Sequence, residues 1–302
     1  MPAFVLAHLS DPHLAPLPLP GISELALKRI LGFLNWHRAR RRRHRSPVLA
    51  AIVRDLQFRM PDHVAVTGDL VNISLAREFA AARAWLEALG PARDVSVVPG
   101  NHDAYVRAAA DEAFRHWGAY MQGDAGPAAV GTAFPYLRRR GAIALIGVSS
   151  ALPTGPLMAT GRVGDAQLGR LAELLERLAR DRLFRIVMIH HPPLPSPGRH
   201  LKRLVDSRAF CDVLARHGAE LVLYGHDHVH AEHWLEGPDR RIAAIGVPSA
   251  SAAREAAAHP AAYNLYSIEG GPGAWRCEAL SRGLGQAGEE IVDLKRWTIA
   301  RG

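Results

Sequence analysis

Five short apolar runs, each ending in a polar motif, constrain the fold more than any other feature of the sequence. Each run has the length and the continuous apolar character of a strand buried on both faces in a parallel sheet. Stretches with helical periodicity separate most of these runs, which predicts an α/β fold with much parallel sheet. Ligands of such sheets bind beyond the C-terminal ends of the strands, where the polar motifs lie. The five segments are FVLAHLSDPH from Phe4, HVAVTGD from His63, VSVVPGNHD from Val95, FRIVMIHH from Phe184 and LVLYGHDH from Leu221.

The segments between and after these runs complete the expected architecture. Ser46 and Pro47 predict the start of a helix whose apolar stripe begins at Leu49. Further stripes predict helices over residues 76–89, 104–121, 165–179 and 207–216. The short strands RRIAAIGVPS, YNLYSI, WRCEAL and IVDLKRWTI follow Tyr224, and we expect them to complete a second sheet that YLRRRGAIALIGVSS begins. The loops are too short to be linkers, so residues 1–302 are predicted to form a single domain.

The charge of the chain is concentrated in one segment. The sequence has 37 Lys and Arg against 29 Asp and Glu, a formal net charge of +8. Eight of the basic residues lie between Lys28 and Arg45 with no acidic residue among them, so the rest of the chain is balanced. Two distant cysteines make no disulfide framework, the N-terminus has no signal-peptide pattern, and no apolar run is long enough to span a membrane. We therefore expect a cytoplasmic protein, with peripheral contact at the inner membrane face as an open alternative.

Polar side chains with metal-binding chemistry follow all five strands. Imidazole, carboxylate and amide oxygen donors without thiolates suit Mn, Fe or Zn rather than a structural thiolate zinc site. In an extended segment residues i and i+2 point to the same side, so the pairs Asp11 with His13 and His226 with His228 are each expected to turn two ligands one way. One such motif is weak evidence, but five at the same edge of a sheet predict a metal site. The strand ends carry Asp11, His13, Asp69, Asn101, His102, Asp103, His190, His191, His226 and His228.

In this order the motifs D-x-H, G-D, G-N-H-D, H and G-H-x-H resemble the signature of the calcineurin-like metallophosphoesterase family. Here they read DPH, GD, GNHD, HH and GHDH, and every signature position is filled. The resemblance implies a two-sheet αββα sandwich with a dinuclear metal site at the C-terminal strand ends. It implies two divalent or trivalent ions (Mn, Fe or Zn), the first held by Asp11, His13 and His228, the second by Asn101, His190 and His226, and both by a bridging Asp69. The residues expected beside the ligands without binding metal are His191, Asp227, His230 and His233.

Two cations at such a centre acidify a shared water to hydroxide near neutral pH, bind phosphoryl oxygens and stabilise the charge that develops during in-line displacement. The sequence therefore predicts a dinuclear metal-dependent phosphoesterase whose nucleophile is a metal-bridging hydroxide. His102 and Asp103 are the predicted catalytic residues, as a cation or proton donor for the leaving oxygen, and a purely supporting role for His102 stays open. The sequence has no GxSxG or GxxxxGK[ST] motif that would offer another chemistry. The resemblance favours bacterial phosphodiesterases of the cyclic-nucleotide and glycerophosphodiester type, which act on small-molecule phosphodiesters.

The segment between His13 and Asp69 is longer than one helical crossover needs, and the excess forms an insertion over about residues 20–46. Ser23 is expected to cap a helix, with Phe33 and Trp36 beside its apolar face and the arginines following. This composition is typical of a helix in an anionic membrane interface, which residues 24–45 would contact. A helix packed on the protein's own surface with a solvated basic end is the alternative. The expected apolar face consists of Leu27, Ile30, Leu31 and Leu34.

The insertion keeps more than one function open. Beside the soluble phosphodiesterase, a membrane-facing helix favours a peripheral-membrane hydrolase of a lipid-linked diphosphate, of the UDP-diacylglucosamine type. A non-catalytic relative that binds membrane or nucleic acid is disfavoured because no metal ligand is missing. Nucleic acid is also disfavoured because one aromatic residue, Trp36, lies among the charges and the sequence has no recognition fold. The sequence makes no prediction of the oligomeric state.

Overall fold

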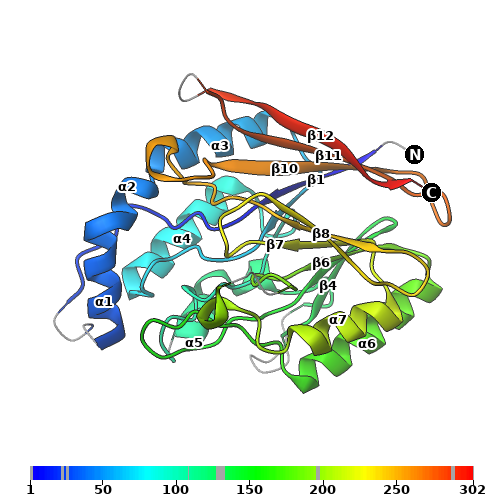
Figure 1. Ribbon diagram of the computed structural model, residues 1–302, viewed down its shortest axis with the longest axis horizontal. Coiled ribbons are helices and arrows are strands. Elements are labelled where there is room, and N and C mark those ends of the chain that lie inside the picture. The colour runs from blue at the N-terminus through cyan, green and yellow to red at the C-terminus, as the bar shows by residue number, and fades with distance from the viewer. Residues whose placement is uncertain are drawn as a thin grey trace.

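Two six-stranded sheets lie face to face in the computed structural model, and helices cover their outer faces (Figure 1). The structure describes residues 3–21, 24, 27–107, 109–126, 133–194, 198–286 and 290–301. The strand order is β12-β11-β10-β1-β2-β3 in the first sheet and β4-β5-β6-β7-β9-β8 in the second. This arrangement confirms the expected two-sheet αββα sandwich.

The first sheet combines parallel and antiparallel pairs. β1 pairs in parallel with β2, and β2 pairs in parallel with β3. β10 runs antiparallel along the other side of β1, and β11 and β12 follow as antiparallel neighbours. The strands of this sheet are β1 Phe4–Leu9, β2 His63–Val66, β3 Val95–Val97, β10 Ala262–Glu269, β11 Arg276–Leu284 and β12 Ile291–Arg301.

The last three strands do not lie where the sequence places them. YNLYSI, WRCEAL and IVDLKRWTI form β10, β11 and β12 and join the first sheet, so the expectation that they complete the second sheet is wrong. β2 occupies one edge of β1, and β10 fills the other edge in register from Phe4 opposite Ile268 to His8 opposite Asn264. The apolar pattern of a strand shows which face is buried but does not identify the neighbouring strand.

In the second sheet four strands are parallel and the two edge strands are antiparallel to their neighbours. YLRRRGAIALIGVSS forms β4 and β5 and begins this sheet, as expected, while RRIAAIGVPS supplies β9. The strands are β4 Tyr136–Arg140, β5 Ile143–Gly147, β6 Phe184–Met188, β7 Leu221–Tyr224, β8 Ala231–Leu235 and β9 Ile242–Gly246.

Alternating side chains of the second sheet pack into two different hydrophobic cores, one on each face of the sheet. In β5, Ile143 and Leu145 belong to the core between the sheets, and Ala144 and Ile146 pack toward α6 and α7 on the outer face. The helices expected from apolar periodicity are present, although the segment 104–121 forms only α5 and a 3₁₀ turn ending at Met121. The helices are α3 Ser46–Phe58, α4 Ala76–Leu89, α5 Ala109–Trp117, α6 Asp165–Arg180 and α7 Ser207–His217.

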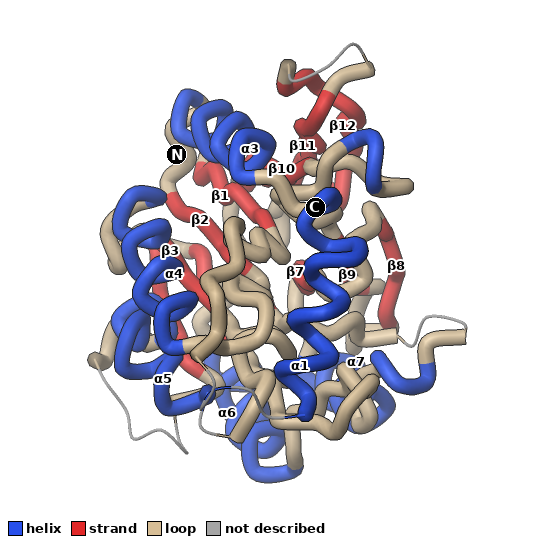
Figure 2. Tube along the Cα trace, turned by 90° about the vertical axis from the view of Figure 1, so that its left-hand side faces the viewer, coloured by secondary structure: helices blue, strands red, loops and turns tan. Residues whose placement is uncertain are grey.

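The insertion after β1 is helical and crosses the end of the sandwich. Its first helix, α1 (Leu27–Asn35), continues through a π-helical turn, Trp36–Arg40, into the short helix α2, Arg41–Arg43. Figure 2 shows α1 in front of the loops that leave the strands. Trp36 is buried and packs with loop residues that include Ile73. The expected N-cap, Ser23, lies outside the described residues.

Candidate metal centre

The loops after β1, β2, β3, β6 and β7 meet at one end of the sandwich and bring the seven predicted metal ligands together. Five of these ligands are 5% exposed or less, and the two histidines after β7 are partly exposed at the opening of the site. Burial of so many polar groups is unfavourable unless they bind each other or an ion. The seven residues are Asp11, His13, Asp69, Asn101, His190, His226 and His228.

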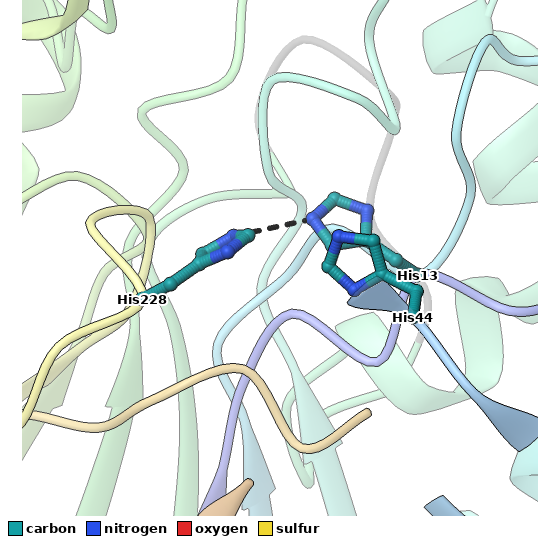
Figure 3. A group of neighbouring side chains, drawn as sticks. All are labelled: His13, His44 and His228. Carbon is teal, nitrogen blue, oxygen red and sulfur yellow. Dashed lines mark hydrogen bonds between the residues drawn. The ribbon is translucent and has the colours of Figure 1, made fainter. Parts of the chain in front are cut away.

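One group of donor atoms comes from the loops after β1 and β7. His228 Nε2 lies 3.1 Å from Asp11 Oδ1 and 3.3 Å from His13 Nε2. Figure 3 shows the rings of His13 and His228 turned toward one another. His13 Nδ1 lies 3.3 Å from the Val71 carbonyl, to which it donates, so His13 Nε2 carries a lone pair. Separations of this size occur between ligands of one ion whose bonds are roughly 2.1 Å long, so this group fits a metal ion.

A second group of donor atoms faces the first across Asp69. His190 Nε2 lies 3.2 Å from both Asn101 Oδ1 and His226 Nδ1. His190 Nδ1 donates to the Thr67 carbonyl at 2.6 Å, so His190 Nε2 is the ring nitrogen that faces Asn101 and His226. Asp69 Oδ2 is 3.5 Å from His190 Nε2 and 3.8 Å from His13 Nε2. Asp69 therefore lies between the two groups and contacts both.

The electrostatics of this centre favour a cation. Burial alone would lower the pKa of His190, but the carboxylates of Asp69 and Asp11 raise it to about 10. Burial also opposes ionisation of Asp69, yet His190 and His102 hold the pKa of that carboxyl well below its usual range. The fold thus stabilises positive charge between buried carboxylates, which is what a metal ion would provide. The donor set and its charge fit the metal ions that the sequence predicts.

The backbone of the ligand loops differs from the expectation. Five ligands have left-handed backbone conformations, so the convergence of Asp11 with His13 and of His226 with His228 does not arise from alternation along an extended strand. Such conformations are uncommon outside glycine, raise the energy by about 1–3 kcal/mol each and cluster at functional sites. The φ angles are 51° at Asp11, 38° at His13, 57° at Asp69, 69° at His226 and 56° at His228.

Glycines in the motifs allow these loops to approach one another. A Cβ atom on Gly100 would overlap the Asp69 carboxylate, and a Cβ on Gly225 would overlap the side chains of Ser10 and Asp11. The G-N-H-D and G-H-D-H motifs therefore need glycine for close packing around the ligands.

His102 and Asp103, the predicted catalytic residues, lie beside Asp69 in different environments. The His102 backbone N–H donates to Asp69 Oδ1 at 2.7 Å, and its ring Nδ1 donates to the Asn72 carbonyl. His102 Nε2 accepts an N–H from Arg40 at 2.8 Å. Burial, followed by Arg40, lowers the pKa of His102 to about 3, so its ring is neutral.

Asp103 is buried and binds the backbone of two loops. Its two carboxylate oxygens accept four backbone N–H groups at 2.8–3.1 Å. These donors belong to the loops after β2 and β3, so the carboxylate ties together the segments that carry Asp69 and Asn101. The four donors are the N–H groups of Asp69, Leu70, Val71 and Gly100.

The structure also places the residues expected beside the ligands. Both ring nitrogens of His191 face protein oxygens, Ser150 Oγ at 2.8 Å and the Ala159 carbonyl at 3.2 Å, so His191 is positioned to support the centre. Asp227 pairs with Arg199 at 2.7 Å at the edge of the site. His230 packs against Trp297 and His233 stacks on Tyr224, away from the donor groups.

Two residues at the centre, Arg40 and His44, come from the insertion and were not identified from the sequence. Arg40 Nη2 is 2.9 Å from both ring nitrogens of His13, which places the guanidinium over the face of that ring rather than in its plane. His44 is 1% exposed, and its Nδ1 is 2.9 Å from Ser251 Oγ. The sequence signal for these two residues was that the arginine run lies in the segment that follows the DPH ligand pair.

A cavity of about 330 Å³ opens above the donor atoms. The insertion forms one wall through residues that include Arg40 and Arg43, and the segment after β6 contributes Arg199 and Lys202 to another. The site is therefore a cationic pocket above buried metal ligands, as a site for phosphate-containing ligands needs.

On α1, Lys28 and Arg29 bind the neighbouring loops, while three apolar residues of the helix stay exposed. Lys28 Nζ donates to the Thr154 carbonyl at 2.8 Å, and the Arg29 guanidinium donates to the Ile73 and Ser74 carbonyls. Three residues of the expected apolar face remain 39–43% exposed, namely Ile30, Leu31 and Leu34. Within the described ranges, no helix has the length and apolar character required to cross a membrane.

The structure is a two-sheet sandwich with a candidate metal centre of His, Asp and Asn donors at its strand ends. A family model described as calcineurin-like phosphoesterase matches residues 4–230, and the chain belongs to this family. Its metal centre provides the donors for metal-dependent hydrolysis of a phosphoester. A search of curated proteins finds no match.

Solved structures with the same fold include two phosphatases and a 5′-nucleotidase precursor. A dimetal phosphatase from Danio rerio is 14% identical, with all of both chains covered and a TM-score of 0.66. A purple acid phosphatase from yellow lupin (Lupinus luteus) seeds is 12% identical over 98% of this chain and 53% of that one, with a TM-score of 0.56. A 5′-nucleotidase precursor from Thermus thermophilus is 14% identical over 92% of this chain and 54% of that one, with a TM-score of 0.51. The chain thus spans about half the length of the lupin and Thermus proteins, and the low identities show a shared fold.

Proposed function

We propose that the chain is a phosphodiesterase that hydrolyses small-molecule phosphodiesters with two bound metal ions. The observation that carries this proposal is the shared position of Asp69 Oδ2, 3.8 Å from His13 Nε2 and 3.5 Å from His190 Nε2. A carboxylate between two groups of donors is the arrangement that a dinuclear centre requires. Family membership supports phosphoester hydrolysis, and the choice of a diester is part of this proposal.

Seven side chains are proposed to hold the two ions. When bound, these cations would lower the pKa of a coordinated water and offset the negative charge of the phosphoryl oxygens. Imidazole with carboxylate and amide oxygen suits Mn, Fe or Zn. The first ion is assigned to Asp11, His13 and His228, the second to Asn101, His190 and His226, and Asp69 to both.

Arg40 is proposed to bind the substrate at this centre, and His102 is proposed to orient Arg40. His102 is neutral and accepts a hydrogen bond from Arg40, which fixes the guanidinium beside the first group of donors. A planar guanidinium offers paired N–H donors to phosphoryl or leaving-group oxygens. In this proposal Arg40 supplies the positive charge that the sequence assigned to His102, while the His102 ring orients Arg40.

Asp103 is proposed to be a positioning residue. Both of its oxygens already accept backbone N–H groups of the ligand loops, and the carboxyl is 1% exposed. A carboxylate that is occupied in this way holds the loops together and is poorly placed to exchange a proton with substrate.

The phosphodiesterase proposal is tested with chromogenic substrates. The Mn²⁺-loaded protein should hydrolyse bis(p-nitrophenyl) phosphate faster than p-nitrophenyl phosphate, and chelation should abolish both rates. The exposed Glu87 provides a matched control, since Glu87→Gln should leave the rates unchanged. A protein that hydrolyses only the monoester would contradict the assignment to diesters.

A second candidate, favoured by the exposed apolar face of α1, is a peripheral-membrane hydrolase of a lipid-linked diphosphate. Ile30, Leu31 and Leu34 are exposed although Lys28 and Arg29 of the same helix hydrogen-bond to neighbouring loops. The loop that receives the Lys28 hydrogen bond also exposes Leu157, at 83%. Apolar side chains beside an arginine run are typical of a surface that binds anionic lipid.

Flotation with anionic liposomes tests the membrane candidate. The intact chain should float with vesicles that contain phosphatidylglycerol, and a variant with Ile30, Leu31 and Leu34 changed to Ser should lose most of this binding. Phe58→Ser is the control, because Phe58 is 77% exposed but lies outside the insertion. Equal flotation of all three proteins would exclude α1 as the membrane contact.

A further inference from the structure

The cavity above the metal centre carries more positive charge than a single phosphodiester requires. A phosphodiester is a monoanion, and two bound metal ions together with Arg40 already offset its charge. The remaining cations therefore point to further negative charge on the ligand. The charged side chains that line the cavity are the cations Arg40, Arg43, Arg199 and Lys202 and the carboxylates Asp69 and Asp227.

These cations belong to two walls of the cavity that are far apart in the sequence. Arg43 closes α2 of the insertion, and its Nε donates to the Ala256 carbonyl at 3.2 Å. This bond fixes the stem of Arg43 at the rim of the cavity. Lys202 ends the 3₁₀ turn after β6 and lines the same cavity as the insertion. Neither the Arg43 Nη atoms nor Lys202 Nζ makes a hydrogen bond to the described residues.

The crowding of these cations is unfavourable without an anion. Partial burial and then Arg199 lower the pKa of Lys202, Asp227 opposes this shift, and Arg40 and Arg43 add to it. Arg199 is compensated by its pair with Asp227. Arg43 and Lys202 have no ion pair with a carboxylate in the part of the chain that the structure describes. A bound anion would relieve this repulsion and gain hydrogen bonds from both walls.

We propose that Arg43 and Lys202 bind a second anionic group of the substrate, so that the substrate class is a diphosphate ester, in which a second phosphate adjoins the scissile one. The inference rests on the proposed function, because the scissile phosphoryl group is taken to lie at the metal centre beside Arg40. A cavity of about 330 Å³ accommodates a diphosphate with part of its attached groups.

The test compares how the Mn²⁺-loaded protein binds methylenediphosphonate and methylphosphonate, measured by isothermal titration calorimetry. The wild type should prefer the diphosphonate. Arg43→Gln and Lys202→Gln should each reduce the preference about tenfold or more, because each removes hydrogen bonds to a charged group. The diphosphonate also chelates the metal ions, and this contribution to its affinity is the same in all proteins. The change in preference between wild type and variant therefore measures the contribution of the replaced side chain.

Arg42→Gln is the matched control, since Arg42 is an exposed neighbour on α2 that does not line the cavity. It should retain the preference of the wild type. The same preference in all four proteins would overturn the inference, even where bis(p-nitrophenyl) phosphate is hydrolysed. A preference that falls in both pocket variants would support the inference even in a protein without diesterase activity, so the two proposals fail separately.

A second experiment distinguishes a soluble diphosphate substrate from a lipid-linked one. Hydrolysis of a soluble nucleoside-diphosphate sugar is compared with hydrolysis of the same compound carrying two fatty acyl chains in mixed micelles. Either activity, reduced in Arg43→Gln and Lys202→Gln relative to Arg42→Gln, supports a diphosphate ester substrate. Faster hydrolysis of the acylated compound identifies a lipid-linked source.

Discussion

Replacement of Asp103 by Asn tests how the metal-ligand loops are held in place. Asp103 Oδ2 accepts the N–H groups of Asp69 and Gly100, both at 2.8 Å, and Oδ1 accepts those of Leu70 and Val71 at 2.9 and 3.1 Å. Asn keeps one oxygen but turns an NH₂ group toward two N–H donors. Burial and the neighbouring Asp69 raise the pKa of Asp103 to about 7, so above that pH Asp103→Asn removes two charge-assisted hydrogen bonds and leaves two buried donors without an acceptor.

The size of the effect follows from these bonds. A hydrogen bond to a charged group contributes about 1.5–3 kcal/mol, so two lost bonds should lower the free energy of unfolding by about 3–6 kcal/mol. The loss should appear in urea unfolding of the metal-free protein. Asp94→Asn is the control, because the ion pair of Asp94 with Arg93 is exposed and should change the midpoint little.

A different result would restore the catalytic role that the sequence predicts for Asp103. If Asp103→Asn unfolds at the wild-type urea concentration but loses one limb of its pH–rate profile, Asp103 transfers a proton and the positioning role is wrong.

Three further substitutions test separate parts of the structure. Gly100→Ala should abolish metal binding, measured as metal content, because its Cβ would overlap the Asp69 carboxylate; a variant with full metal content would refute this packing argument. Arg138→Met should lower the free energy of unfolding by about 3 kcal/mol or more, because the 3% exposed guanidinium donates to four backbone carbonyls, and an unchanged urea midpoint would contradict it. His191→Phe should keep both metal ions, since the His191 nitrogens bind Ser150 and Ala159; loss of one ion would make His191 a ligand.

The polar strand-end motifs predicted which residues meet at the site but not how the backbone brings them there. The order and spacing of DPH, GD, GNHD, HH and GHDH select residues that the structure brings together. The left-handed conformations at Asp11, His13, Asp69, His226 and His228 are imposed by tertiary packing, and a residue's own preference argues against them.

The position of β10 to β12 shows a second limit of sequence reasoning. Their apolar periodicity predicted strands, and the structure contains strands there. Pairing of β10 with β1 joins residues more than 250 positions apart, such as Phe4 and Ile268, and no local pattern specifies that contact.

The insertion was predicted as an amphipathic helix, but its orientation could not be derived from periodicity. The apolar stripe at Ile30, Leu31 and Leu34 would normally be assigned to the core. Instead Trp36, beside the stripe, anchors the helix, and Lys28 and Arg29 bind backbone carbonyls. This orientation exposes the stripe and brings Arg40 to His13, two consequences that only the tertiary contacts determine.

The central claim is that two groups of donors share Asp69 and hold two metal ions for phosphodiester hydrolysis. The most direct measurement adds Mn²⁺ to the metal-free protein and follows hydrolysis of bis(p-nitrophenyl) phosphate while bound metal is counted by mass spectrometry. We predict that the rate reaches its plateau at about two ions per chain, and that Asp69→Asn lowers the plateau by at least about 100-fold because both groups lose their shared carboxylate. A plateau at one ion, or a rate that does not depend on metal, would contradict the claim.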